Sequence, residues 1–201
     1  MDKLKLIGFL WIENNIINKH TTYTKPGSIS YLLYGKRQSV QSINIKLGYF
    51  GEYIIKELIK LNNIFTLLDC GIYNINNKKK DIDILFADNY RKIIYYRELK
   101  GNIELDTEKI EATINKCNEI KESLQNTYTG YIVNFAILNW SVYDRQILSA
   151  GLNNIRKFEH NNIKIDHMED LLNILNIIWD EKDFYSYFVD IGDKIQNNTN
   201  F

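Results

Sequence analysis

The spacing of apolar residues predicts a chain that combines helices and strands. Between residues 45 and 62, apolar side chains recur every three or four positions, which is the period of an amphipathic helix. Mostly apolar runs without the helical period, at 64–73 and 131–140, instead predict buried strands. Similar patterns predict further helices at 3–17, 107–125, 142–150, 168–179 and 183–191, and a further strand at 163–166.

The predicted fold is organised around residues 80–100. Two short apolar segments, 81–86 and 93–100, flank a polar stretch that is rich in turn-forming residues. This arrangement predicts a β-hairpin. Residues 74–80, which end in three lysines, predict a polar turn that leads into it.

Charged side chains of this hairpin are expected to lie together on one face. Alternate residues of a strand face the same side, so Asp81 lies with Asp83. By the same rule Glu98 lies with Lys100, and the folded hairpin can bring the two pairs together. Acids placed in this way are costly unless something binds them. The pattern therefore favours a bound ion.

A divalent cation is the ion that these residue types suit. Asp83 and Glu98 offer hard oxygen ligands, and the backbone carbonyl of Leu99 can add another. Lys100 can then hold an attacking water beside the metal. Glu52, next to Gly51 in the predicted helix 45–62, has two readings: a surface glutamate paired with Lys56, or a third carboxylate over the metal.

The charge distribution is compatible with a nucleic-acid partner although the formal net charge is zero. Residues 166–193 hold eight acids and one base, which leaves 24 bases and 17 acids, a net charge of +7, in the rest of the chain. A solvated acidic tail helix explains the same numbers equally well. The residues expected to contact DNA are the basic arm 19–41, Lys78, Lys79, Lys80, Asn102, Lys109, Lys116 and Arg145.

The cysteines and the N-terminal segment bear on where the protein works. Cys70 and Cys117 have no metal-type spacing and suggest no disulfide framework, which favours a reducing, cytoplasmic compartment. Helix periodicity places Cys117 in the core. The apolar run 6–12 is too short to span a bilayer, so no membrane association is expected.

Together these residues resemble the PD-(D/E)xK nuclease superfamily. The resemblance covers roughly residues 45–140 and rests on Gly51-Glu52, Asp83 and Glu98-Leu99-Lys100. It implies an α/β (α+β), restriction-endonuclease-like core with a central mixed β-sheet flanked by helices. Ile82 stands where the family has a proline, which leaves Asp81 open as the ligand or as an accessory one. Asp83 is preferred because it lies inside the apolar strand, fifteen residues before Glu98.

Within that superfamily the chain looks most like a type II restriction endonuclease, on its compact length and the KGNIELDTEK run. The resemblance implies cleavage of double-stranded DNA at a short palindromic site by a homodimer. It implies Mg²⁺ as cofactor, with Mn²⁺ as a substitute, and no nucleotide cofactor. Asp83, Glu98, Lys100 and Glu52 would be catalytic. Asp83, Glu98 and the Leu99 backbone carbonyl would be the metal ligands, with Glu52 and Asp81 as candidate additional ones. One domain is expected: an N-terminal helix and basic arm (1–44), a catalytic core (45–140) and a mostly helical part with an acidic tail (141–201).

Other readings remain open. A junction resolvase or repair nuclease of the same superfamily would have the same site residues. From a different class, a catalytically inactive DNA-binding module would keep the shape without the metal. Gly71-Ile72-Tyr73 matches half of the GIY-YIG nuclease motif, but no second half follows. The three histidines, His20, His160 and His167, lack metal-ligand spacing, and His160 and His167 are expected at the surface or in turns.

Overall fold

The computed structural model describes residues 1–19, 27, 29–34, 40–105, 107–147 and 151–198. The chain forms two compact units. The helical unit comprises Met1–Ile54 and Trp179–Phe201, and the sheet unit comprises Ile55–Ile178. Most of the basic arm 19–41 lies outside the described residues.

The helical unit is held together by aromatic side chains. Its helices are α1 (Asp2–Ile12), continued by a π-helical turn η1 (Glu13–Ile17), α2 (Ile29–Tyr34), the first part of α3 (Val40–Lys60), and α7 (Glu181–Asn198). The rings of Phe9 and Tyr187 meet edge to face at 5.2 Å between centroids. A Cβ on Gly8 would lie only 1.9 Å from the Tyr187 hydroxyl, so glycine is what allows this close packing. The helices predicted at 3–17, 45–62 and 183–191 are confirmed, the last as part of a longer helix.

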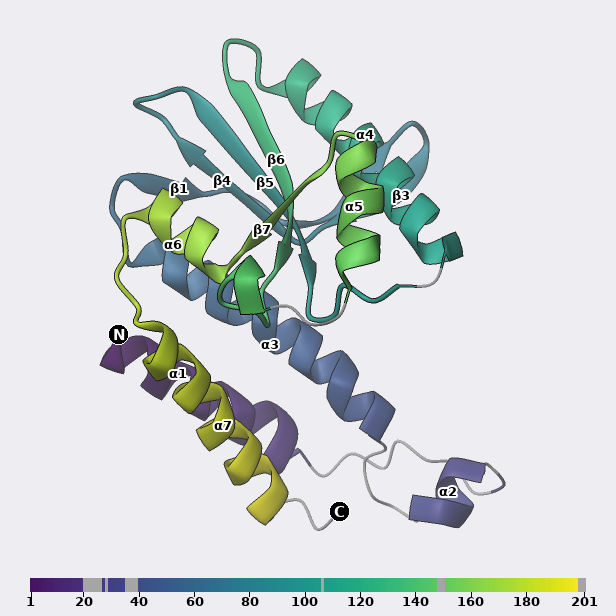
Figure 1. The fold of residues 1–201 in the computed structure, drawn as a ribbon, viewed down its shortest axis with the longest axis vertical. Helices are drawn as coiled ribbons and strands as arrows, with labels where there is room; N and C mark the ends of the chain where they lie inside the picture. Colours follow the sequence, from purple (N-terminus) through teal and green to yellow (C-terminus); the bar gives the residue numbers. More distant parts are fainter. Residues whose placement is uncertain (20–26, 28, 35–39, 106, 148–150, 199–201) are drawn as a thin grey trace. The chain divides into compact units, whose positions relative to one another are not determined.

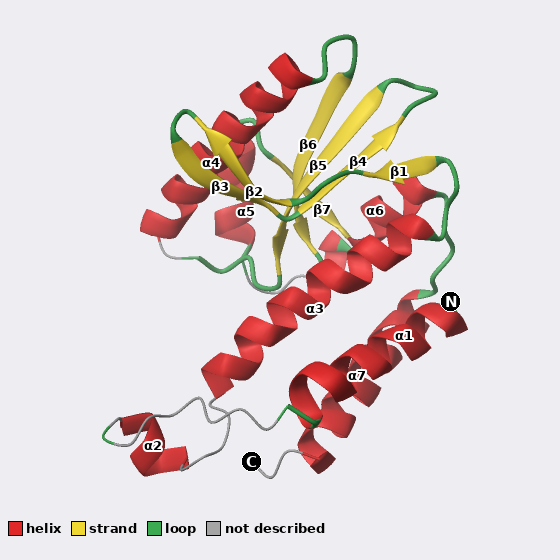
Figure 2. Ribbon diagram, turned by 180° about the vertical axis from the view of Figure 1, so that it is seen from behind, coloured by secondary structure: helices red, strands yellow, loops and turns green. Residues whose placement is uncertain are grey.

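A five-stranded mixed sheet forms the centre of the sheet unit (Figure 2). Its first three strands pair antiparallel and its last three pair parallel. The predicted α/β class, with a central mixed sheet flanked by helices, is therefore confirmed. In spatial order the strands are β1 (Phe65–Leu67), β4 (Ile84–Asp88), β5 (Ile93–Lys100), β6 (Ile132–Asn139) and β7 (Lys164–His167).

Two crossover helices cover one face of this sheet. Helix α4 (Thr107–Thr127) joins β5 to β6, and α5 (Leu152–His160) joins β6 to β7. Apolar side chains of both helices, such as Cys117 and Phe158, pack with Ile137 and Ile165 of the sheet. Helix α6 (Met168–Leu175) lies on the other side of β7 from α5 (Figures 1 and 2). Crossovers of this kind are what join parallel strands.

Two short strands next to the sheet correct the prediction for residues 64–80. We expected one buried strand followed by a polar turn, but the structure has β1, a break, and a hairpin of β2 (Gly71–Ile75) with β3 (Lys78–Ile82). The tight turn lies at Asn76 and Asn77, which have positive φ angles of 51° and 60°. Asparagine tolerates this left-handed conformation, and two such residues make the preferred two-residue hairpin turn.

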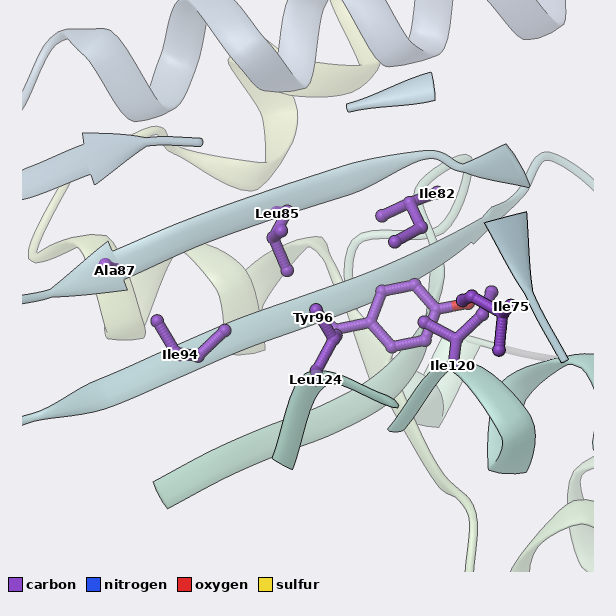
Figure 3. Packing of buried hydrophobic residues seen from close by; sticks show 8 residues of the cluster. All are labelled: Ile75, Ile82, Leu85, Ala87, Ile94, Tyr96, Ile120 and Leu124. Atoms are coloured by element: carbon purple, nitrogen blue, oxygen red, sulfur yellow. The ribbon is translucent and has the colours of Figure 1, made fainter. Parts of the chain in front are cut away.

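The two candidate aspartates, Asp81 and Asp83, lie in different parts of the backbone. The expected single strand 81–86 is interrupted at Asp83, between β3 and β4. Asp81 pairs with Ile72 in the small hairpin, whereas Asp83 stands at the start of the central strand. Ile75 and Ile82 of the hairpin pack with Tyr96 in the cluster shown in Figure 3. The hairpin thus adds apolar cover beside the central strands.

The C-terminal third also departs from the sequence prediction. The expected helix 142–150 is represented, in its described part, by a single 3₁₀ turn, Arg145–Ile147, and α5 was not predicted. His167 is buried rather than at the surface, because it ends β7 and its backbone N–H donates to Asp170 at the start of α6. The predicted acidic tail is not solvated throughout, since Asp166 is fully buried.

Asp166 is buried because it pairs with a buried arginine. Its Oδ2 lies 2.8 Å from an Arg97 guanidinium nitrogen, and both side chains are at most 1% exposed. Arg97 also donates to the Asn134 backbone carbonyl and side-chain oxygen, at 2.9 and 2.8 Å. These contacts join β5, β6 and β7 on the face opposite to Glu98, because Arg97 and Glu98 are successive residues of one strand.

Replacing Asp166 by asparagine should strongly destabilise the protein. The substitution leaves the Arg97 charge buried without a counter-charge, which should lower the free energy of unfolding by about 3–5 kcal/mol in urea denaturation. Lys164→Met is the control, because Lys164 contacts the same carboxylate at 2.6 Å but its side chain is 63% exposed. Its loss should cost less than about 1 kcal/mol. Similar losses from both variants would contradict this account.

Candidate functional site

The register of β4 and β5 places the two predicted metal ligands opposite each other. Ile84 pairs with Arg97 in this antiparallel ladder, and one further step along it brings Asp83 opposite Glu98. Opposed residues point to the same face of a sheet. Tyr96 and Lys100, two residues on either side of Glu98, share that face. The structure therefore brings Asp83, Glu98 and Lys100 together, as the hairpin pattern predicted.

Glu98 is the central carboxylate of this group. Its side chain is only 3% exposed, and Lys100 donates to its Oε1 at 2.9 Å. Lys116, from α4, donates to Oε2 at 2.6 Å, and the Tyr96 hydroxyl donates to the same oxygen at 3.2 Å. Burial opposes ionisation, but the two ammonium groups outweigh it and hold the pKa of Glu98 below its ordinary value. Glu98 is thus a buried, oriented carboxylate ion.

Asp83 has the opposite electrostatic character. The backbone N–H of Leu99 donates to its Oδ2 at 2.7 Å, and Lys116 Nζ lies 3.9 Å from its Oδ1. Burial, followed by the nearby Glu98 charge, raises the pKa of Asp83 to about 7, against the lowering effect of Lys116. Two carboxylates whose environments move their pKa values apart are typical of a functional site rather than of an ordinary surface.

The donor atoms of this site suit a small divalent cation. In an extended strand the N–H and C=O of one residue point to the same side, so the Leu99 carbonyl faces the edge where its N–H meets Asp83. Two carboxylates and one carbonyl leave positions for water and a phosphate oxygen, which is how Mg²⁺ is usually bound. Among the described residues, no three His, Cys, Asp or Glu side chains form a metal-binding group.

Lys116 and Tyr96 are site residues whose role the sequence analysis missed. Lys116 was expected to contact DNA, but its ammonium lies on the carboxylates. Strand alternation alone would have placed Tyr96 beside Glu98. For Lys116 the signal was weaker, because only the packing of α4 against the sheet fixes which side of the helix meets Glu98. Cys117, its neighbour, is buried as predicted, and burial raises its pKa to about 12, which disfavours the reactive thiolate form.

A cavity of about 340 Å³ opens beside the Glu98 carboxylate. Glu98 and Lys100 line it from β5, and one side of α4 lines it with side chains spaced three or four residues apart. Three of its lining residues are lysines and one is a glutamate, so the cavity favours an anionic ligand. Its lining residues are Glu98, Lys100, Leu105, Lys109, Ala112, Thr113 and Lys116.

The remaining candidate residues lie in other surroundings. Glu52 is half-buried in α3 within the helical unit, so its role as a third ligand stays a prediction. Asp81 is exposed in β3, apart from the strand that carries Asp83. Arg145 forms an exposed two-point ion pair with Glu159, at 2.6 and 3.2 Å. This pair occupies the guanidinium N–H groups with which Arg145 would hydrogen-bond to a DNA base.

The predicted DNA-binding lysines before the hairpin are in a strand rather than a turn. Lys78 and Lys79 are exposed on β3, whereas Lys80 pairs with Glu119 of α4 at 3.1 Å. The Asn102 side chain accepts the Glu104 N–H at 2.8 Å and so stabilises the loop after β5. Lys78 and Lys79 are therefore the exposed members of the predicted lysine run, and Lys109 lines the cavity beside Glu98.

No protein-family model matches this sequence, and no curated protein is significantly similar to it. Within the described ranges, every helix is too short or too polar to cross a lipid bilayer.

Asp83→Asn should stabilise the protein at alkaline pH when metal is removed by EDTA. The native pKa of Asp83 is about 7, above the value of about 4 for an unfolded chain, so the folded state binds the extra proton in this range. The contribution of Asp83 to wild-type stability should therefore fall as the pH rises from about 4 to 7. The variant lacks this loss and should exceed wild type by about 1–3 kcal/mol at pH 8.

Urea denaturation at pH 5 and pH 8 measures this difference. The exposed Asp81→Asn serves as the control and should change stability by less than about 0.5 kcal/mol at either pH. If Asp83→Asn is less stable than wild type at pH 8, the carboxylate contributes to folding and our description of the site is incorrect.

Proposed function

We propose that this protein is a Mg²⁺-dependent endonuclease that hydrolyses phosphodiester bonds of double-stranded DNA. The observation that carries the proposal is the cross-strand pair of Asp83 and Glu98, with the Leu99 backbone beside it and Lys100 in contact. The site also has a carboxylate with a raised pKa and a neighbouring cavity lined by lysines. An ion-pair cluster that served only to stabilise the fold would require neither feature. A phosphodiesterase site needs both a metal-binding pair and a place for a phosphate.

Each residue has a defined task in this proposal. Asp83 and Glu98 would hold the metal, which supplies charge neutralisation at the phosphoryl oxygens. Lys100 reaches the cavity with a side chain 22% exposed, so it can orient a water for in-line attack while contacting Glu98. Tyr96 fixes the rotamer of Glu98 from the buried side through its hydroxyl.

Among metal-dependent nucleases, a type II restriction endonuclease is our preferred assignment. A symmetric dimer would match a short palindromic site and cut one strand with each protomer. Such an enzyme needs no nucleotide cofactor, and Mn²⁺ should substitute for Mg²⁺ because both take oxygen ligands. Asp81 is proposed only as an accessory ligand, and the role of Glu52 stays a prediction. A junction resolvase or a repair nuclease would use the same site on a different substrate.

Purified protein should cut a long mixed-sequence duplex DNA into discrete fragments when Mg²⁺ is present. EDTA should abolish the fragments because it removes the metal. Lys100→Ala should do so because it removes the ammonium that holds the water, and Asp83→Asn because it removes a metal ligand. We expect a rate loss of at least about 10²-fold for each variant. Gel electrophoresis of digests sampled over time measures both the pattern and the rate.

The fragment pattern separates the alternatives. A smear that needs both Mg²⁺ and Lys100 would support the metal site but indicate a non-specific or repair nuclease. Uncut duplex together with cut four-way junctions would indicate a resolvase. No cleavage of either substrate, with unchanged DNA binding by Asp83→Asn, would contradict the proposed enzyme and favour an inactive binding module. Arg156→Ala, on α5, is a matched control that removes an exposed positive charge outside the cavity lining.

A further inference from the structure

We infer that Lys116 occupies the metal position when no metal is bound, and that its displacement couples metal binding to phosphate binding. The inference rests on the proposed function and assigns Lys116 a positioning role within it. The Lys116 ammonium lies 2.6 Å from Glu98 Oε2 and 3.9 Å from Asp83 Oδ1. Lys100 contacts Glu98 through the other oxygen, Oε1. Lys116 is therefore the lysine that bridges the two carboxylates.

A metal and this ammonium would compete for the same oxygens. Mg²⁺ bound by both carboxylates would lie about 2 Å from an oxygen of each, in the space beside the Lys116 ammonium. Two cations that share one carboxylate oxygen repel each other strongly in a partly buried site. Metal binding should therefore move Lys116 away from Glu98 and Asp83.

The cavity beside the site can receive the displaced ammonium. Lys116 has a flexible four-carbon side chain that is 24% exposed, and it lines this cavity together with Lys109 and Thr113 of the same helix. Once released from Glu98 and Asp83, the Lys116 ammonium has lost its anionic partners. A phosphate group of the substrate entering the cavity would supply one.

The charge of the site explains the coupling. With both acids ionised, Asp83 and Glu98 balance Lys100 and Lys116, so the metal-free cluster is neutral and attracts phosphate weakly. A divalent metal brings the cluster to a net charge of +2 and frees Lys116. Metal and DNA should therefore each raise the affinity for the other, as linkage requires.

Titration of Mn²⁺ into DNA-free protein at pH 8, followed by calorimetry, tests the competition directly. Lys116→Met should bind Mn²⁺ roughly tenfold more tightly than wild type, because the competing charge is gone. Lys116→Gln, which keeps a hydrogen-bond donor without the charge, should show the same direction and serves if the methionine variant does not fold. Lys121→Met, on the same helix outside the cavity lining, should match wild type.

The outcomes separate the inference from the proposed function. Equal or weaker Mn²⁺ binding by both Lys116 variants, with measurable binding by wild type, would overturn the inference and leave the metal site in place. No Mn²⁺ binding by wild type or by either variant would overturn both.

A second readout concerns the phosphate. In a Lys100→Ala background that prevents cleavage, the salt dependence of duplex binding should steepen when Mn²⁺ is added. When Mn²⁺ is added, the slope of log K against log salt should change by about 0.9 more for the protein that keeps Lys116 than for the Lys116→Met variant. A difference of this size corresponds to one phosphate contact. Identical slopes for the two proteins in Mn²⁺ would show that the released lysine does not contact DNA and would overturn the coupling.

Discussion

The placement of two carboxylates opposite each other on adjacent strands is the constraint on which the site depends. Burial, and after it repulsion by the Glu98 charge, raises the pKa of Asp83 and so opposes keeping both groups ionised there. The fold meets this constraint by interrupting the strand at Asp83, so that its carboxylate takes the Leu99 N–H, and by placing two lysines on Glu98. A cation of higher charge would satisfy the same oxygens better than the lysines do.

Contacts on both faces of the sheet hold the strands and the helix that carry the site residues. Arg97 precedes Glu98 in β5 and points to the opposite face, where its ion pair with Asp166 ties the central strand to β6 and β7. On the same face as Glu98, the Tyr96 ring packs in the apolar cluster with Ile120 and Leu124 of α4 (Figure 3). The position of α4, and therefore of Lys116, is thus set by hydrophobic packing. Rigid packing around a strained charge cluster is typical of sites that bind a ligand.

How far the sequence predicts this structure depends on whether the deciding interaction is local. Strand β5 at residues 93–100 and the alternation that places Glu98 with Lys100 follow from the hydrophobic pattern, and the sequence predicted both. The break at Asp83 was not predictable in this way, because a hydrogen bond to a residue sixteen positions away causes it. The position of Lys116 depends on the packing of α4 onto the sheet, and the burial of Asp166 depends on Arg97. Both interactions join segments that are distant in sequence, which single-sequence patterns do not reveal.

A crystal structure of the protein soaked in Mn²⁺, with the metal located by its anomalous scattering, would test the central claim most directly. The account predicts one peak in contact with Asp83, Glu98 and the Leu99 carbonyl oxygen, with the Lys116 ammonium moved into the neighbouring cavity. An anomalous map without a peak at these oxygens, and with Lys116 still between the two carboxylates, would contradict it. The cluster would then be a structural ion-pair network, and the proposed nuclease activity would lose its physical basis.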